Sequence, residues 1–145
     1  MTAAGTHSRL LEALADAAPD ALLVVNASGR IRFANQATLA LFQFSPEQLI
    51  GKPIETLIPQ RYRGRHRGDR SRYANDPRNR PMGLNMELVG RRRDGSEVPV
   101  EVSLSPLQVD GERLVIAAVR DVTELKRSRE LLRRSQRQLA LARLA

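Results

Sequence analysis

Residues 84–104 read LNMELVGRRRDGSEVPVEVSL, and the pattern in this stretch fixes the type of structure. Apolar and polar side chains alternate on both sides of Asp94-Gly95. Such alternation is typical of strands with one buried and one solvent-exposed face. Asp-Gly between two strands favours a tight hairpin turn. The stretch therefore predicts two antiparallel strands, at 84–92 and 97–104.

Two further strand-like runs, 21–25 and 31–34, are separated by a glycine turn, and a last run, 114–120, follows a second Asp-Gly turn at Asp110-Gly111. The first and last runs are apolar on both faces, which favours central positions in a sheet. We therefore expect one antiparallel sheet of about five strands, with the first and last strands side by side in its middle. The second strand lies at one edge in this arrangement, and the strand 84–92 lies at the other.

Residues 35–83, between the second and third strands, carry helical signals. Ser45-Pro46-Glu47-Gln48 is typical of a helix start, because Ser caps, Pro suits the first helical position and Gln48 reaches back in a capping box. Short helices are predicted at 35–42, from Ser45 to Gly51, at 54–58 and at 61–73.

An N-terminal helix is predicted at 7–17. Its Leu10, Leu11 and Leu14 share one face, and Pro19 prevents its continuation. Two arrangements are open for this helix. It either contributes to a dimer or packs back over its own sheet and leaves a monomer.

A C-terminal helix is predicted from Asp121 onward. Asp121 and Glu124 have the spacing of a capping box, and neither Gly nor Pro follows them. Leu125, Leu132 and Leu139 recur every seven residues, which predicts a thin coiled-coil seam between two copies of the helix. Two effectors placed after such a parallel pair would be brought together.

The order of strand pair, helical insert, three-strand meander and acidic-capped helix resembles the PAS fold of bacterial signalling proteins. The resemblance covers about residues 13–125 and rests on seven motifs in register. These are Asp20-Ala-Leu-Leu-Val-Val25, Asn26-Ala-Ser-Gly-Arg-Ile31, Phe33-Ala-Asn35, Gly51-Lys52, Leu57-Ile-Pro59, Arg92-Arg-Asp-Gly95 and Asp121-Val-Thr-Glu124. It implies an α+β fold, a PAS-like five-stranded antiparallel sheet with a helical insert on one face. The N-terminal helix occupies 1–18, the sensory domain 19–121 and the start of a signalling helix 122–145.

The resemblance also implies a function. In this family the last strand runs into a helix that drives an effector, commonly the histidine kinase of a two-component system or a cyclic-dinucleotide enzyme. Asp121, Thr123 and Glu124 lie where strand becomes helix, so they are candidates for signal relay, although a plain helix cap explains them as well. We expect a sensory module that forms a homodimer and is either isolated or part of a longer protein. A small molecule is the ligand we expect for such a module.

Composition narrows the classes of protein. The chain has no Cys, two His, no phosphate-cradling glycine loop and no apolar run near the roughly 20 residues of a membrane span. We therefore expect a cytoplasmic protein with no catalytic core and no metal site. Between Arg61 and Arg93, eleven arginines stand against three acidic residues. Nucleic acid or an anionic metabolite bound at 61–80 is a lesser alternative, because stacking aromatics are scarce there.

The cofactor is left open by the sequence. Without Cys, the covalent flavin adduct and the thioester pigment of light-sensing members are excluded. Haem is the alternative that the resemblance offers, because haem-binding oxygen-sensor kinases of the family ligate iron through a His that His66 matches, with Tyr73 also in place. Asp69 and Arg70 depart from the apolar residues of those kinases. Met86, which replaces a distal Arg, is a candidate pocket residue or a core filler.

Overall fold

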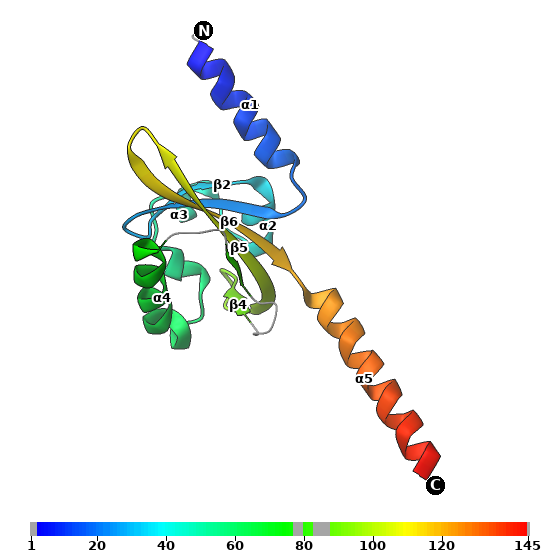
Figure 1. Ribbon diagram of the computed structural model, residues 1–145. Helices are drawn as coiled ribbons and strands as arrows, with labels where there is room; N and C mark the ends of the chain where they lie inside the picture. The colour runs from blue at the N-terminus through cyan, green and yellow to red at the C-terminus, as the bar shows by residue number, and fades with distance from the viewer. Residues whose placement is uncertain (1–2, 77–79, 83–87, 145) are drawn as a thin grey trace.

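The computed structural model describes residues 3–76, 80–82 and 88–144, which form one antiparallel sheet, a group of helices on one of its faces and two terminal helices (Figure 1). The spatial order is β2-β1-β6-β5, and β3 and β4 both pair with β5 at the far edge. The five expected strand positions are therefore present. The strands are β1 (Ala21–Asn26), β2 (Ile31–Ala34), β3 (Arg80–Met82), β4 (Leu88–Arg91), β5 (Glu97–Val109) and β6 (Glu112–Asp121).

The first and last strands lie side by side, as the sequence predicts. β1 and β6 pair along their length, with Leu23 opposite Ala117 on one face and Val24 opposite Ile116 on the other. Leu23 and Ala117 are buried, whereas Val24 and Ile116 stay partly exposed. One face of the sheet is therefore the core face, and we call the opposite one the outer face.

The helices between β2 and β3 start where their capping residues stand. Asn35 caps α2, and Ser45 precedes α3, where its N–H donates to Gln48 Oε1 at 3.0 Å. The backbone of Gln43 takes a positive φ of 67° and closes α2. The helices of the chain are α1 (Ala3–Ala17), α2 (Gln36–Phe42), α3 (Pro46–Leu49), the 3-10 turns η1 (Ile54–Leu57) and η2 (Gln60–Tyr62), α4 (Arg63–Asn75) and α5 (Thr123–Leu144).

The hydrophobic core lies between the core face and these helices. Leu23 and Val98 from the sheet, Phe42 from α2 and Leu49 from α3 are all buried in one cluster. Burying a side chain of this size stabilises the fold by roughly 1.5–3 kcal/mol relative to leaving it in water. The clustering explains why such short helices persist, because packing and not helix propensity holds them.

The β5–β6 hairpin is longer than the sequence predicts. Its turn is at Asp110-Gly111 as expected, and positive φ angles of 50° and 78° at these two residues match the right-handed twist of the strands. The strands extend beyond 104 and before 114, so that Val109 pairs with Glu112. Alternation of apolar and polar residues fades after Leu104, because this end of the hairpin projects beyond the core and both of its faces are open.

The predicted strand 84–92 is described only as β4, and Leu84 and Met86 lie outside the described residues. β4 pairs with β5 from Leu88 opposite Val100 to Arg91 opposite Glu97. A second short strand, β3, pairs with the neighbouring part of β5, and no pattern in the sequence predicts it.

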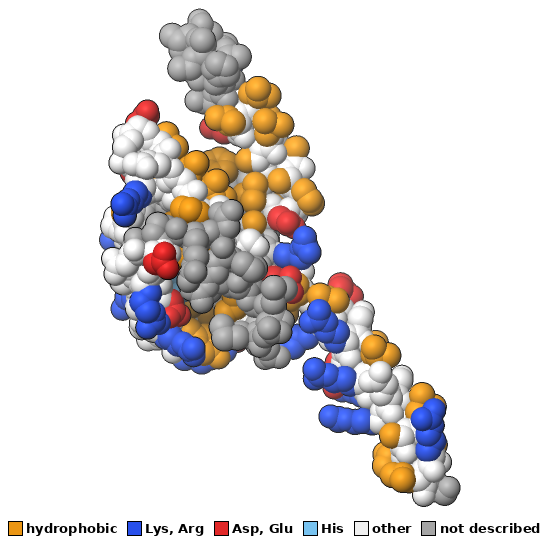
Figure 2. All heavy atoms as spheres, viewed as in Figure 1, with side chains coloured by type: hydrophobic (Ala, Val, Ile, Leu, Met, Phe, Trp, Pro, Cys, Tyr) orange, Lys and Arg blue, Asp and Glu red, His pale blue; other side chains and the backbone are white. Residues whose placement is uncertain are grey.

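The two terminal helices project away from the body of the domain (Figure 1). Apolar side chains line both helices where no other element touches them in this view (Figure 2). Across the described residues, neither these helices nor any other is long and apolar enough to cross a membrane.

Two glycine-to-alanine substitutions are expected to change stability in opposite directions. A Cβ at Gly90, in β4, would lie 2.7 Å from Phe42 Cε1 within the core, whereas a Cβ at Gly68, in the middle of α4, meets no atom within 4 Å. Gly90→Ala should lower the free energy of unfolding by about 1–3 kcal/mol through overpacking. Gly68→Ala should raise it by up to about 1 kcal/mol through helix propensity. Urea unfolding of both variants checks this, and equal signs would contradict the described packing.

Candidate functional site at the helix junctions

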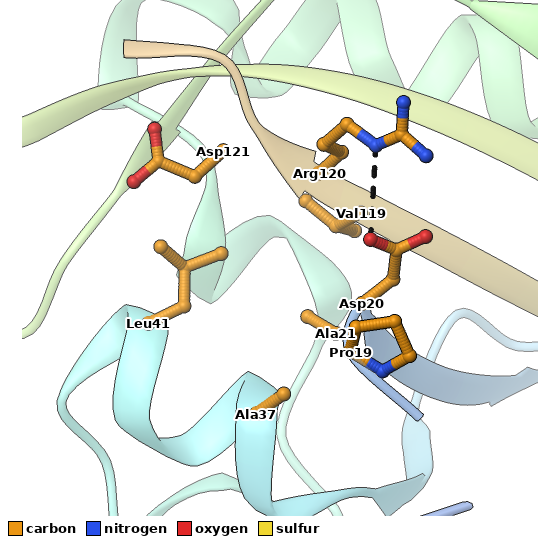
Figure 3. A pocket seen from close by; sticks show the side chains of 8 residues that line it. All are labelled: Pro19, Asp20, Ala21, Ala37, Leu41, Val119, Arg120 and Asp121. Atoms are coloured by element: carbon orange, nitrogen blue, oxygen red, sulfur yellow. Dashed lines mark ion pairs between the residues drawn. The ribbon is translucent and has the colours of Figure 1, made fainter. Parts of the chain in front are cut away.

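A hollow of about 250 Å³ lies where α1 leads into the sheet and α5 leaves it (Figure 3). Leu41 and Ala37 of α2 and Val119 of β6 form its apolar side. Its polar side holds Asp20 and Arg120, whose Oδ1 and Nε atoms lie 3.7 Å apart. The full lining is Pro19, Asp20, Ala21, Ala37, Leu41, Val119, Arg120 and Asp121. Its lining is part apolar and part charged, and its volume is below the roughly 300–1,000 Å³ of typical ligand pockets.

The fully buried side chain of Asn35 joins three elements beside this hollow. Its Oδ1 accepts from Leu22 N at 2.8 Å, Thr38 N at 3.1 Å and Thr38 Oγ1 at 2.8 Å. Its Nδ2 donates to Ala15 O at 2.7 Å and to Asp20 O at 3.0 Å. Both amide hydrogens are used, so the carboxamide is saturated. One side chain therefore connects α1, β1 and α2.

A second bond supports the connection to α1. Asp16 Oδ1 accepts from Gln36 N at 2.9 Å. Together with the Asn35–Ala15 bond, it holds the last turn of α1 against the first turn of α2. The direction in which α1 leaves the domain is thus set by a pair of hydrogen bonds, which we call the α1 latch. α2 packs on the core face, so the latch lies on that side of the sheet.

The junction between β6 and α5 is held in a similar way. Asp121 Oδ1 accepts from Thr123 N at 2.9 Å and from Thr123 Oγ1 at 2.5 Å. Val122 N donates to Pro99 O of β5 at 3.0 Å. The first turn of α5 is therefore fixed to the sheet through two successive residues.

Glu124 does not complete the capping box that its spacing suggests. Its carboxylate is exposed, and Oε1 lies 3.3 Å from Arg127 Nη1 on the next turn. The helix starts at Thr123, and its first backbone bond runs from Lys126 N to Val122 O at 2.9 Å. Val122 therefore occupies the cap position, and Glu124 lies on the solvent side of the first turn.

Leu125, Leu132 and Leu139, the predicted seam, lie along one side of α5 with exposed fractions of 42%, 60% and 62%. A repeat of seven residues keeps these side chains on one stripe of the helix. Among the described residues, these three leucines belong neither to the core cluster nor to the partly buried residues packed against it. A surface for another helix is thus available.

His66 lies on α4 beside the carboxylate of Glu55, which is almost fully buried on η1. His66 Nδ1 is 3.7 Å from Glu55 Oε2. Arg70 Nη2 lies 2.9 Å from Glu55 Oε1, and Arg67 Nε lies 3.7 Å from the same oxygen. Arg70 also presses against Gly29, where any Cβ would be 1.8 Å from its Nη1. One acidic group thus anchors three side chains of α4.

The electrostatics keep His66 uncharged near neutral pH. Burial lowers the pKa of His66 below its ordinary value, Glu55 opposes this shift, and Arg70 adds to it. His66 Nδ1 and Glu55 Oε2 have no hydrogen-bond partner among the described residues. At 3.7 Å, the ring nitrogen and the carboxylate oxygen lie close to each other without a hydrogen bond between them.

In the described part of the chain, the surroundings of His66 differ from those of a haem ligand. A haem-ligating His faces a large, mostly apolar slot, whereas the charged groups that act on His66 are Glu55, Arg70 and Asp69. The hollow described above is lined by other residues. Tyr73 is buried close to the core, and Met86 lies outside the described residues. Among these described residues, no three His, Cys, Asp or Glu side chains form a group that could hold a metal ion.

Several arginines of the basic segment have carboxylate partners within the chain. Arg61 makes a two-pronged bond to Glu97, at 2.5 and 2.7 Å, which lowers the pKa of Glu97. Arg72 pairs with Asp69 one turn away. Such pairing reduces the charge available for nucleic acid or an anionic metabolite, and it favours a structural role for part of the segment.

The sequence pattern points to Asp121 and the terminal leucines as candidates, but it does not point to the role of Asn35. The signal for it was present, because Asn at the end of a strand and before a helix is a favoured N-cap. A cap motif alone does not reveal that the same side chain reaches α1, which lies 20 residues earlier.

Comparison with known proteins identifies the class. The family model described as PAS fold matches residues 15–127, so the chain belongs to the PAS-fold family. The crystal structure of the PAS domain of an HTR-like protein from Haloarcula marismortui agrees with it at a TM-score of 0.67 and 27% identity, over 81% of this chain and 93% of that one.

The similar sequences include sensors. Sensor protein FixL of Bradyrhizobium diazoefficiens is 31% identical over 134 residues, which are 92% of this chain and 26% of FixL. Oxygen sensor protein DosP of Escherichia coli K12 is 29% identical over 101 residues, which are 70% of this chain and 13% of DosP. The chain thus spans about a quarter or less of the length of these sensors, which it resembles as a PAS sensory domain.

Removing the Asn35 carboxamide should destabilise the domain. Asn35→Ala leaves the buried N–H of Leu22 and the carbonyls of Ala15 and Asp20 without this partner, so the free energy of unfolding should fall by about 3 kcal/mol or more. The matched control is Asn75→Ala, at an exposed site at the end of α4, which should change it by less than about 0.5 kcal/mol. Similar losses in both variants, measured by urea unfolding, would remove the special role of Asn35.

His66 should titrate below its ordinary pKa of about 6.5 in the folded protein. Because the folded pKa is lowered, the unfolded chain takes up this proton first. The contribution of His66 to the free energy of unfolding is therefore fully present above about pH 6.5. It is lost as the pH falls below that value toward the lower pKa of the folded protein. NMR titration of the ring gives the pKa, and the acid-side loss of stability should shrink in His66→Gln.

Added hemin tests the same environment in a different way. No sharp Soret band that His66→Ala abolishes should appear. A band of that kind would show that the ring is free to ligate iron, whereas a His66 pKa above about 6.5 would show that the charged ring pairs with Glu55.

Proposed function

We propose that the chain is the sensory module of a signal-transduction protein, is not itself an enzyme, and relays a change in the domain through α5 to an effector such as a histidine kinase. The observation that carries this proposal is the continuous path from β6 into α5. β6 is a central strand, flanked by β1 and β5. A shift of the sheet therefore moves the start of the helix directly.

The coupling passes through the bonds at the β6–α5 junction. Asp121 holds both the N–H and the hydroxyl of Thr123, and Val122 is bonded to Pro99 on the neighbouring strand. A change in the relative position of β5 and β6 strains these bonds unless α5 follows. The start of α5 is thus attached to the sheet at two points. Glu124 contributes only a surface contact within the helix.

The effector side of the proposal is a parallel homodimer. The exposed stripe of Leu125, Leu132 and Leu139 gives two α5 helices a shared seam. Three leucines over 22 helical residues make a weak coiled coil. A weak seam suits a switch, because small free-energy changes at the junction then alter how the helices pair.

The input is a small molecule or a partner that acts beside the junctions. The hollow at Asp20, Leu41 and Arg120 adjoins Asp121, so an occupant there contacts the residue that holds α5. Haem sensing at His66 is the other candidate that similarity to an oxygen sensor raises. The charged surroundings of His66 give it no support.

Asp121 should control output in a chimera. Residues 1–145 are joined in helical register to the catalytic core of a dimeric histidine kinase, and autophosphorylation is measured. Asp121→Ala removes the bonds to Thr123 and should change the rate by about fivefold or more, the usual scale of allosteric coupling.

Asn26→Ala is the matched control for this experiment. Asn26 Oδ1 makes the same kind of bonds, with Ser28 N at 3.1 Å and Ser28 Oγ at 3.1 Å, in the turn after β1, at the opposite end of the sheet from the β6–α5 junction. It should leave the rate unchanged. Equal effects of the two substitutions, or none from either, would refute the relay through Asp121.

A further inference from the structure

Glu97, the first residue of β5, is bound by a side chain from the helical side of the domain. Arg61 of η2 donates to both of its carboxylate oxygens, at 2.5 and 2.7 Å. A two-pronged bond of this kind fixes the orientation of the two groups as well as their distance. The guanidinium carbon of Arg61 also lies 4.6 Å from the centre of the Tyr62 ring, which helps to hold the arginine in place. η2 and the start of β5 are therefore joined in a defined geometry.

The start of β5 leads directly to the junction of β6 and α5. Pro99 lies two residues after Glu97, roughly 7 Å along an extended strand. Its carbonyl accepts the N–H of Val122 at 3.0 Å, and the next residue, Val100, lies opposite Asp121. Asp121 and Val122 are the two residues that precede α5. A displacement of Glu97 along β5 therefore reaches the start of the helix.

Internal bonds tie η1, η2 and α4 together, and we call these residues, 54–75, the α4 segment. Arg70 of α4 bonds the carboxylate of Glu55 in η1 at 2.9 Å, and Arg63 Nε donates to Ile58 O at 3.0 Å. Because the Glu55 side chain is only 5% exposed, its bond to Arg70 is costly to break. A displacement of α4 therefore moves η2 and its arginine as well.

The α4 segment and the hollow are separate parts of the domain. Among the described residues, those that line the hollow include none from the segment. Arg67 of α4 is 64% exposed, and a Cβ at Gly64 or Gly68 would meet no described atom within 4 Å. α4 therefore has an open side, and an event there can displace it without any change in the hollow.

We propose that the Arg61–Glu97 bond carries displacements of the α4 segment along β5 to α5. Both side chains act as positioning residues, because their effect on α5 passes through the bond between Pro99 and Val122. The route rests on the proposed relay and adds a second input to it, besides the hollow. Two kinds of event, one at the hollow and one at α4, then change the position of the same helix.

Amide hydrogen exchange of Val122, followed by NMR in residues 1–145, tests the route without an effector. Glu97→Gln keeps the size of the side chain and removes the charge that Arg61 holds. The Val122 N–H should then exchange about fivefold faster or more, because Pro99 is held less firmly and the junction opens more often. Urea unfolding of the same variant measures global stability, so that an increase beyond the global change is assigned to the junction.

Exchange of the two charges separates positioning from local packing. Arg61→Glu alone should raise the Val122 exchange rate as Glu97→Gln does, because two carboxylates then face each other. Arg61→Glu with Glu97→Arg forms an ion pair of reversed polarity at the same place, and it should return the rate to the wild-type value. A merely structural role of either side chain would not produce this recovery.

The Arg32–Glu112 pair is the matched control. Its atoms lie 2.6 Å apart, and its side chains are 51% and 45% exposed, compared with 54% and 40% for Arg61 and Glu97. It joins β2 to the hairpin end of β6, at the opposite end of that strand from α5. Glu112→Gln should therefore leave the exchange rate of Val122 unchanged.

The contrary outcomes are distinct from failure of the proposed relay. An unchanged Val122 exchange rate in Glu97→Gln would overturn the route, and so would an equal increase in Glu112→Gln or a charge exchange that restores nothing. None of these results depends on kinase output. If Asp121→Ala leaves the kinase chimera unchanged while Glu97→Gln still speeds Val122 exchange, the relay fails and the route to the junction stands. With a working relay, unchanged autophosphorylation in Glu97→Gln would overturn the route as well.

Discussion

The amide side chain of Asn35 is the interaction on which the arrangement depends. It is buried between a strand and a helix, and each of its polar atoms bonds to a different part of the backbone. Without water to replace these partners, the amide fixes the start of β1, the start of α2 and the exit of α1 together. The position of the hollow beside β1 and α2, and the direction of α1, both follow from it.

The strands and their order were predictable because their signals are local. Val98 and Val100 alternate with polar residues, and the Asp110-Gly111 turn adopts the positive φ angles that only a few residue types accept. Pairing of the first and last strands followed from apolar residues on both faces of each. The extra length of β5 and β6 was not predictable, because hairpin residues beyond the core have no buried face to impose a pattern on the sequence.

The candidate site was less predictable, because it depends on contacts between residues distant in the sequence. Asp121 was identified from its position after a strand and before a helix, yet the start of α5 at Thr123 moved Glu124 away from the cap. The matching position of His66 suggested iron ligation. Its actual neighbour is Glu55, 11 positions earlier, and no periodicity in the sequence reveals that a buried carboxylate faces α4.

The chain enters and leaves the domain beside the same hollow, where Asp20 and Arg120 face each other at 3.7 Å. Figure 1 shows α1 and α5 pointing away from this region in roughly opposite directions. The two helices thus form nearly one helical rod, which is interrupted at a single place. The domain lies at the side of that interruption. Such a geometry makes the domain an insertable unit. Whole copies can be added to or removed from a longer rod during evolution, provided that the helical phase on the two sides of the interruption is kept.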